Sequence, residues 1–327
     1  RKSALFQSII TFSFIMLKQQ FISTPVKEVL TDNNTLAVIP LAKQCEPFEA
    51  GMITTGLEGI AAPAPSEVWT VSQPTERGQT GNTYWSKTSE LICLAHWLSK
   101  DECDNIEHYT QKAYESVLSV MTEQGFTYPF RFWNYLPAIN EGTGDDELYK
   151  KFCTGRLKAF ENAGLTPANF PAASALGHHS DGAVVYLFAS NQPPQHFKNT
   201  KQVNAYEYPR QYGISSPSFA RATALTLSNV NYLFISGTAS ITGHQTLGEN
   251  DLEKQLEVTQ SNIEHLLTNA NPENLSLSTF KVYVRHPADV AFTRSWLEAR
   301  YPGVEMLFTI ADICRKELLV EIECFCI

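Results

Sequence analysis

A run of structural signals occurs twice along this chain, and this repetition constrains the fold more than any other feature. In the first copy, apolar side chains recur at helical spacing over residues 103–124. A β-rich run at 128–136 follows and stops at Pro137, and a second helical pattern covers 145–162. The order helix, strand, proline, helix is that of one α+β unit.

The second copy begins about 150 residues later. A helical stripe covers 252–267, a β-rich run covers 279–285 before Pro287, and another helical pattern covers 288–301. This spacing predicts a duplicated α+β fold of mixed sheets with helices packed on one face. Further strands are expected at 35–41, 183–189, 231–236, 304–310 and 318–326.

We therefore divide the chain into an N-terminal extension at 1–35, a degenerate first half at 36–175 and a second half at 176–327. The second half should carry most of a functional site. The extension opens with two basic residues and an apolar run at 4–17, like a weak signal peptide. It lacks a small-residue cleavage site, and the run is short for a membrane span. We interpret residues 1–20 as an appended extension, with a targeting role as the alternative.

Composition limits the partners. Apolar residues make up 43% and charged residues 18% of the chain, which predicts a well-cored globular protein. A net charge of −9 argues against nucleic acid or an anionic membrane as a partner. Seven cysteines at irregular spacing, without a CxxC motif, favour free thiols and a cytoplasmic location. An anion would have to bind in a local basic pocket.

One such pocket is indicated by the stretch 206–212, which holds three tyrosines around Pro209 and Arg210. Arg221 follows a few residues on. A guanidinium matches a carboxylate through two parallel hydrogen bonds, and tyrosines add ring faces and hydroxyls. The pattern favours a small cyclic dicarboxylate as ligand. A polar surface loop with aromatic residues is the alternative, since 190–218 is rich in Pro, Gly, Asn and Gln.

The last strand places Glu321 and Glu323 on one face and Val320, Ile322 and Cys324 on the other. The simplest interpretation is a half-buried strand with a solvated acidic face. The alternative puts a carboxyl group in a cleft, where burial would raise its pKa and suit it to general-acid work.

The C-terminal half resembles the RidA/YjgF superfamily. The resemblance rests on a strand ending in Ser236-Gly237, on the Gln-containing helix that starts near Gln255, and on the terminal V-E-I-E at 320–323. The deaminases of that superfamily bind a carboxylate with an arginine on the penultimate strand. Residues 305–308 hold none, so deamination is not expected.

A longer resemblance, over residues 125–327, is to the chorismatases, which remove pyruvate from chorismate and carry a RidA-like fold. It rests on the stretches 131–137, 152–156, 175–179, 206–213, 216–221, 236–240 and 314–321. The resemblance implies two RidA/YjgF-like (chorismate mutase-like) halves acting on chorismate without cofactor or metal. It also implies a monomer or a RidA-like homotrimer. His178, His179 and Asp181 lack the spacing of a metal site and are interpreted as structural.

The resemblance further implies the roles of individual residues. Glu321 falls at the position of the acid that protonates the enolpyruvyl group, whereas Glu323 is expected to be structural. Cys314 lies seven residues earlier, the spacing found in chorismatases that release hydroxybenzoate; the neighbouring Arg315 and Lys316 could partly activate its thiol. Substrate contacts are expected from Arg210, Arg221, Arg156, Tyr149, Tyr206, Tyr208, Thr238 and Ala239.

The expected product is 3-hydroxybenzoate, alone or together with 4-hydroxybenzoate. Two alternatives stay open. One is hydrolysis of chorismate to 3,4-dihydroxycyclohexa-1,5-diene carboxylate. The other is a non-catalytic RidA-like protein that binds a small molecule. The first half has no equivalent of the terminal V-E-I-E and is expected to serve as scaffold.

Overall fold

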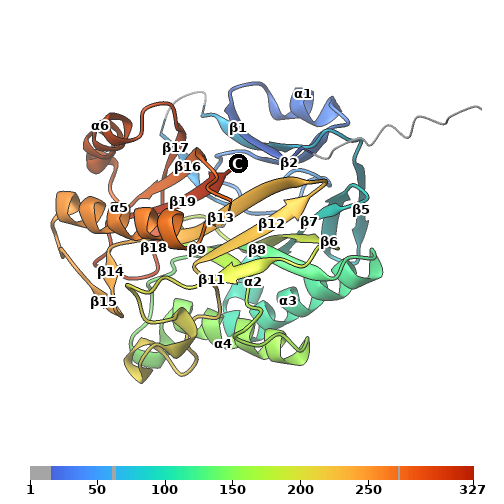
Figure 1. Cartoon of the computed structure of the whole chain (residues 1–327). Coiled ribbons are helices and arrows are strands. Elements are labelled where there is room, and N and C mark those ends of the chain that lie inside the picture. The colour runs from blue at the N-terminus through green and yellow to red at the C-terminus, as the bar shows by residue number, and fades with distance from the viewer. Residues whose placement is uncertain (1–15, 61–63, 272) are drawn as a thin grey trace, which may run out of the picture.

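The computed structural model describes residues 16–60, 64–271 and 273–327. Of the four β-sheets in the described residues, three turn their inner faces toward one another, and helices cover the outer faces (Figure 1). Two of these three sheets have seven strands and one has three, while the fourth sheet is a two-stranded hairpin of β14 (Ile241–Thr242) and β15 (Gln245–Thr246). The predicted α+β class and its duplication are confirmed, because the two large sheets repeat the same strand order.

The first large sheet is built around β8, which pairs with β10 on one side and, in parallel, with β9 on the other. Helix α4 makes the crossover between β8 and β9, and it packs beside α3 under the sheet (Figure 1). The strands, in spatial order, are β18 (Asp312–Ile313), β9 (Ala172–His178), β8 (Tyr128–Pro137), β10 (Ala183–Ser190), β7 (Leu91–Leu98), β6 (Thr83–Lys87) and β5 (Glu76–Thr80). The helices are α2 (Lys100–Cys103), α3 (Ile106–Glu123) and α4 (Leu148–Asn162).

The second large sheet is the repeat of the first. Its β16 pairs with β19 and, in parallel, with β17, and α6 makes the crossover. The strands, in order, are β11 (Gln195–Phe197), β12 (Ala222–Leu227), β13 (Val230–Thr238), β19 (Val320–Cys326), β16 (Leu277–Val284), β17 (Glu305–Ile310) and β3 (Glu58–Gly59). Its helices are α5 (Leu252–Asn269) and α6 (Val290–Arg300). Each large sheet ends in a short strand from the other part of the chain, β18 or β3.

The third sheet comes from the first 70 residues. Its strands are β1 (Lys18–Ile22), β4 (Ser66–Thr70) and β2 (Thr35–Ile39), with α1 (Val26–Thr31) outside. The segment predicted as an extension therefore supplies β1 and α1, while residues 1–15 lie outside the described residues. In the described ranges, no helix is long and apolar enough to cross a membrane.

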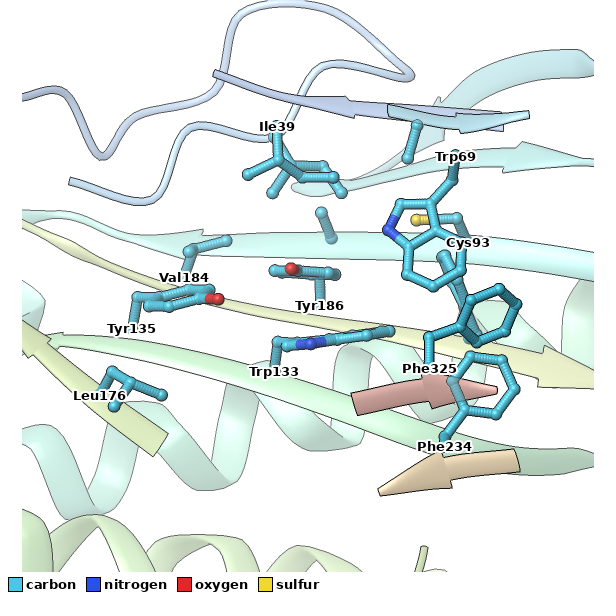
Figure 2. Packing of buried hydrophobic residues seen from close by; sticks show 14 of the residues in the cluster. Ile39, Trp69, Cys93, Trp133, Tyr135, Leu176, Val184, Tyr186, Phe234 and Phe325 are labelled. Atoms are coloured by element: carbon cyan, nitrogen blue, oxygen red, sulfur yellow. The ribbon is translucent and has the colours of Figure 1, made fainter. Parts of the chain in front are cut away.

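The three sheets share one aromatic core (Figure 2). The ring of Trp69, from the third sheet, lies with its centroid 6.1 Å from that of Trp133 and 5.1 Å from that of Phe325. Trp133 belongs to β8 and Phe325 to β19, so the three rings come from three different sheets. Aromatic side chains contribute large buried areas, and the sheets stabilise one another through them.

The two large sheets meet along a seam between β9 and β13. The amide of Ala173 donates to Ser236 Oγ at 3.0 Å, and Ser236 Oγ donates to the carbonyl of Ala220 at 2.6 Å. Beside this contact the β13–β19 pairing shifts register between Ile235 and Thr238, which marks a β-bulge. Bulges re-aim side chains next to functional sites. The seam with its bulge positions the site described next.

Candidate active site

A cavity of about 410 Å³ opens at this seam. Its wall combines β9 and α4 of the first half with β13, β19 and the loops of the second half. The lining residues that matter for the chemistry are Tyr149, Arg156, Ser174, Tyr208, Tyr212, Phe219, Arg221, Gly237, Ala239, Cys314, Arg315 and Glu321. The site therefore draws on both halves of the chain.

Glu321 is the buried acid of the cavity. Its residue is 4% exposed, and burial, helped by the nearby Glu323 carboxylate, raises its pKa to about 8, against the opposing charges of Arg131 and Arg221. The carboxyl group is consequently mostly protonated at neutral pH. The solvated acidic face offered by the sequence pattern is wrong, because the first large sheet covers this face of β19. A neutral carboxylic acid in a cavity can donate a proton.

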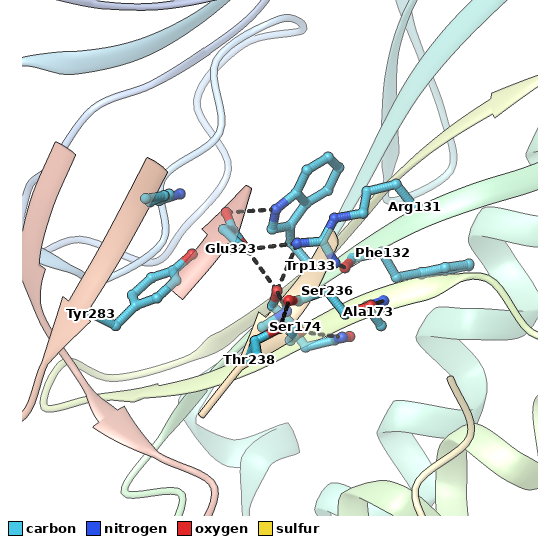
Figure 3. A network of polar contacts seen from close by, with 12 residues as sticks. Arg131, Phe132, Trp133, Ala173, Ser174, Ser236, Thr238, Tyr283 and Glu323 are labelled. Atoms are coloured by element: carbon cyan, nitrogen blue, oxygen red, sulfur yellow. Dashed lines mark hydrogen bonds and ion pairs between the residues drawn. The ribbon is translucent and has the colours of Figure 1, made fainter. Parts of the chain in front are cut away.

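Glu323 lies on the same face and is held in a closed network (Figure 3). Its Oε2 accepts from Arg131 Nη2 and from Ser174 Oγ, both at 2.6 Å, and its Oε1 accepts from Trp133 Nε1 at 3.0 Å. Arg131 also stacks over the Trp133 ring at 4.5 Å. These partners fix the Glu323 carboxylate, so the two glutamates of the strand face different surroundings.

Gly237 gives Glu321 its space. A Cβ at this position would clash with Glu321 Oε1, so the carboxyl group would have to shift. The amide of Gly237 donates to Ser174 Oγ at 3.0 Å, and this hydroxyl also binds Glu323. The bulge thus lets the backbone approach the acid closely, a role in which glycine is preferred.

Two of the predicted arginines reach the cavity. Arg221 donates to the Tyr208 hydroxyl at 2.7 Å and lies over the Phe219 ring at 4.9 Å, and its Nε is buried without a hydrogen-bond partner. Arg156 is buried in α4, and its Nε also lacks a partner. Buried N–H groups of this kind normally have an acceptor. Both arginines can therefore offer a hydrogen bond to an anion.

Arg210 does not point into the cavity. Its guanidinium binds both carboxylate oxygens of Asp145, at 2.8 and 2.7 Å, and its side chain is 64% exposed. The structure thus places Arg210 outside the cavity lining, unlike the other two predicted arginines. The physical reason is a nearby acid: Asp145, in the short turn η1 (Gly144–Asp146), pairs with this arginine at the surface.

Of the other residues predicted to contact the substrate, some line the cavity and some do not. Tyr149, Tyr208 and Ala239 line the cavity. Tyr206 instead packs with its ring 5.9 Å from Phe170 and lines a separate hollow of about 280 Å³. Thr238 is buried and donates to the carbonyl of Ser236 at 2.8 Å, outside the cavity lining. The cavity keeps seven of the ten predicted residues: Glu321, Cys314, Arg221, Arg156, Tyr149, Tyr208 and Ala239.

Cys314 lines the cavity as a neutral thiol. Burial raises its pKa to about 12, and the Glu321 carboxylate, which is ionised at the high pH where the thiol titrates, adds to the effect more than Arg315 opposes it. The expectation that Arg315 and Lys316 activate the thiol is therefore wrong. A protonated thiol beside the acid can shape the cavity and exclude water from it, but it is no nucleophile.

Five of the lining residues named above were not among the predicted catalytic or substrate-binding residues: Ser174, Tyr212, Phe219, Gly237 and Arg315. Arg131, which binds Glu323 beside the cavity, was not predicted either. Arg131 offered the clearest signal, since a lone charge in an otherwise apolar strand must find a partner. The expected structural role of His178 fits its burial, which lowers its pKa to about 4. The described part of the chain holds no group of three or more His, Cys, Asp and Glu side chains suited to a metal ion.

The chain is thus an α+β protein whose cavity lies at a seam between two repeated sheets. The cavity holds one neutral acid and several arginine side chains with unpartnered N–H groups, an arrangement suited to small carboxylates.

Residues 67–189 match the family described as "Chorismatase FkbO/Hyg5-like, N-terminal". A 3-hydroxybenzoate synthase of Streptomyces hygroscopicus is 33% identical over 89% of this chain and 91% of its own length. A chorismatase of the same species is 34% identical over 79% of this chain and 78% of its own.

A crystal structure of a chorismatase superposes with a TM-score of 0.87 at 28% identity, covering 96% of this chain and 99% of the other. This chain belongs to the chorismatase family. The predicted resemblance and fold class are thereby confirmed.

Proposed function

We propose that this protein is a chorismatase that removes pyruvate from chorismate and releases 3-hydroxybenzoate. The observation that carries the proposal is the neutral Glu321 in a cavity that also presents unpartnered arginine N–H groups. Chorismate carries two carboxylates and an enol ether, so it needs cationic partners and one proton donor. The 3-hydroxybenzoate synthase relative supports the product.

Glu321 would transfer its proton to the methylene carbon of the enolpyruvyl group. The ether carbon then becomes an oxocarbenium centre, and the carboxylate left on Glu321 stabilises that charge. Burial makes this possible at neutral pH, because it keeps the acid protonated. Arg221 lies close enough to Glu321 to affect its charge and is suited to hold the substrate beside it.

The product depends on the nucleophile that reaches this centre. Attack by the ring hydroxyl next to the ether forms a cyclic ketal. The bond between this oxygen and the ring then breaks as the proton on the neighbouring, ether-bearing ring carbon is lost, which makes the ring aromatic. Cleavage of the former ether bond at the ketal carbon releases 3-hydroxybenzoate and pyruvate, whose atoms sum to chorismate. Attack by water gives pyruvate and the diene diol, which together contain one more water. The neutral Cys314 thiol in the wall supports the first route, because a thiol holds water less well than a hydroxyl or a carboxylate.

The test is incubation of the purified protein with chorismate, with products identified by mass and retention time. Pyruvate together with 3-hydroxybenzoate, in equal amounts, is the expected result; 4-hydroxybenzoate alongside it would widen the product range. Pyruvate with the diene diol would overturn the product. Chorismate that decays no faster than in buffer would overturn the activity and leave the binding protein.

We also infer that the chain acts as a cytoplasmic monomer. All seven cysteines are free thiols, which suits a reducing compartment. The inner faces of the three sheets are covered by one another within one chain, so no second copy is needed to bury them. Light scattering during size exclusion should give a mass near 36.6 kDa; three times that mass would favour the homotrimer.

A further inference from the structure

Arg315 is a cavity residue whose guanidinium is held in one orientation. It follows Cys314 in the loop between β18 and β19. Its Nη1 donates to the carbonyl of His244 at 2.9 Å and to Thr246 Oγ1 at 3.1 Å. The guanidinium also stacks on the Tyr212 ring at 4.2 Å. Hydrogen bonds at one nitrogen and an aromatic face below fix where the other nitrogen points.

That other nitrogen, Nη2, is buried and has no hydrogen-bond partner within the described ranges. Nor does any carboxylate of the described residues lie within ion-pair distance of Arg315, in contrast to Arg131, Arg210 and Arg285. An unpaired buried donor costs about 1–3 kcal/mol, and more when it is charged. A ligand acceptor in the cavity would remove this cost.

The backbone under Arg315 is rigidly braced. Arg285, at the end of β16, donates to the carbonyl of Arg315 at 2.9 Å, to that of Ile313 at 3.1 Å and to that of Leu318 at 2.7 Å. Gln255 of α5 bonds the carbonyl of Glu317 at 2.8 Å. Such support is typical of residues that must be placed accurately for binding.

We propose that Arg315 binds a carboxylate of the substrate, in the place that the sequence suggested for Arg210. The inference rests on the proposed function, which requires two anionic groups to be held. Arg210 pairs with Asp145 at the surface, whereas Arg315 is fixed in the wall and its Nη2 has no hydrogen-bond partner among the described residues. Together with Arg221 and Arg156, it places three guanidinium groups in the lining of one cavity, each with one buried nitrogen that has no hydrogen-bond partner among the described residues.

The test compares Arg315→Gln with the wild-type protein in steady-state turnover of chorismate. We expect KM to rise about ten- to hundred-fold while kcat changes several-fold less, because the lost bonds hold substrate and transition state alike. Arg315→Lys keeps the charge but loses the planar guanidinium with its paired N–H donors. Its KM should therefore lie between those of the wild-type protein and Arg315→Gln. The matched control is Arg294→Gln, which removes the same charge from an exposed side chain of α6 outside the cavity lining and should raise KM much less.

Product inhibition then shows which carboxylate is bound. If Arg315→Gln weakens inhibition by 3-hydroxybenzoate, the ring carboxylate is the partner; if it weakens inhibition by pyruvate, the enolpyruvyl carboxylate is. Either result supports the inference. Unchanged KM and unchanged inhibition, in a variant that melts within a few degrees of wild type, overturn it.

Failure of the proposed function would look different, because the wild-type protein itself would then not turn over chorismate. In that case calorimetric titration with 3-hydroxybenzoate decides the inference without turnover. Weaker binding to Arg315→Gln than to wild type supports a carboxylate contact. Equal binding, or no binding to either protein, overturns it.

Discussion

The two glutamates of β19 are two residues apart and lie in different surroundings. Glu323 has an arginine, an indole and a serine as donors, so its negative charge is compensated. Glu321 has no such set of hydrogen bonds among the described residues, and burial raises its pKa to about 8. A carboxyl group that its environment keeps protonated near neutral pH can act as a general acid.

The pH dependence of turnover should report Glu321. Because the acid must be protonated, kcat/KM should be flat near neutral pH and fall as pH rises through about 8. Glu321→Gln should lower kcat by about a hundred-fold or more and abolish this alkaline limb. Rates across a pH series, with substrate decay subtracted, check both. An alkaline limb that survives in Glu321→Gln would assign it to another group.

The stability of the folded protein should also depend on pH because of the raised pKa of Glu321. The folded-state pKa of Glu321 is raised, so its contribution to stability is fully present below its ordinary pKa and is lost as pH rises through about 8. Gln has no such dependence. The melting temperature of Glu321→Gln should therefore exceed that of wild type increasingly between pH ~5 and ~9. A constant difference across thermal melts in that range would contradict the shifted pKa.

Arg131 should stabilise the folded protein because it compensates the buried charge of Glu323. Arg131→Met leaves the Glu323 carboxylate buried without its cation, and we expect a loss of about 3–5 kcal/mol in the free energy of unfolding. Adding Glu323→Gln should restore much of that loss. Urea titrations of both single variants and the double variant measure the coupling. Additive losses would show that the pair does not interact.

At the scale of elements, the bulge in β13 brings backbone against the acid. Gly237→Ala places a methyl group at 2.0 Å from Glu321 Oε1, so the acid must move. We expect kcat to fall about a hundred-fold, as misplacement of a reacting group by about an ångström does. The shorter acid in Glu321→Asp leaves room for the methyl group, so Gly237→Ala should cost much less in that background. Equal effects in both backgrounds would argue against the clash.

Two surface loops are joined by the Arg210–Asp145 pair, which links η1 to η3 (Arg210–Tyr212). An exposed pair of this kind is worth about 0.2–1 kcal/mol. Arg210→Ala should therefore raise KM less than about five-fold, and Asp145→Ala should have a similar effect. Arg221→Ala, in the cavity, should raise KM more than about ten-fold. A larger effect of Arg210→Ala than of Arg221→Ala would restore Arg210 as a substrate ligand.

The elements were largely predictable because helical spacing, β-rich runs and terminal prolines are local signals, and α3, α4, α5 and α6 lie where those signals placed them. The face of Glu321 followed from strand alternation. Its burial did not, because the covering residues Trp133 and Ser174 are far away in sequence. The pairing of Arg210 with Asp145 also escaped prediction, since it depends on which acid a loop brings near.

At the scale of the whole molecule, the proposed halves at 36–175 and 176–327 share a core. Trp69, Trp133 and Phe325 come from three sheets, and β9 crosses the proposed boundary. We expect one cooperative unfolding transition, with tryptophan fluorescence and far-ultraviolet circular dichroism coinciding in urea. Residues 176–327 expressed alone should expose the faces of Phe234 and Phe325 and aggregate. Two separate transitions would show independent domains.

Equivalent positions in the two repeated sheets hold different residues. Tyr283 of β16 stands four residues before Pro287 and pairs with Glu321, while Trp133 of β8 stands four residues before Pro137 and pairs with Tyr186. Tyr186 therefore occupies in the first copy the place of the acid in the second, and it stacks on Trp133 with ring centroids 4.7 Å apart. In an assembly of identical subunits, one substitution alters every such position at once. Fusion into one chain lets each position change on its own. The second copy can therefore carry a catalytic acid where the first copy carries a residue that only packs in the core.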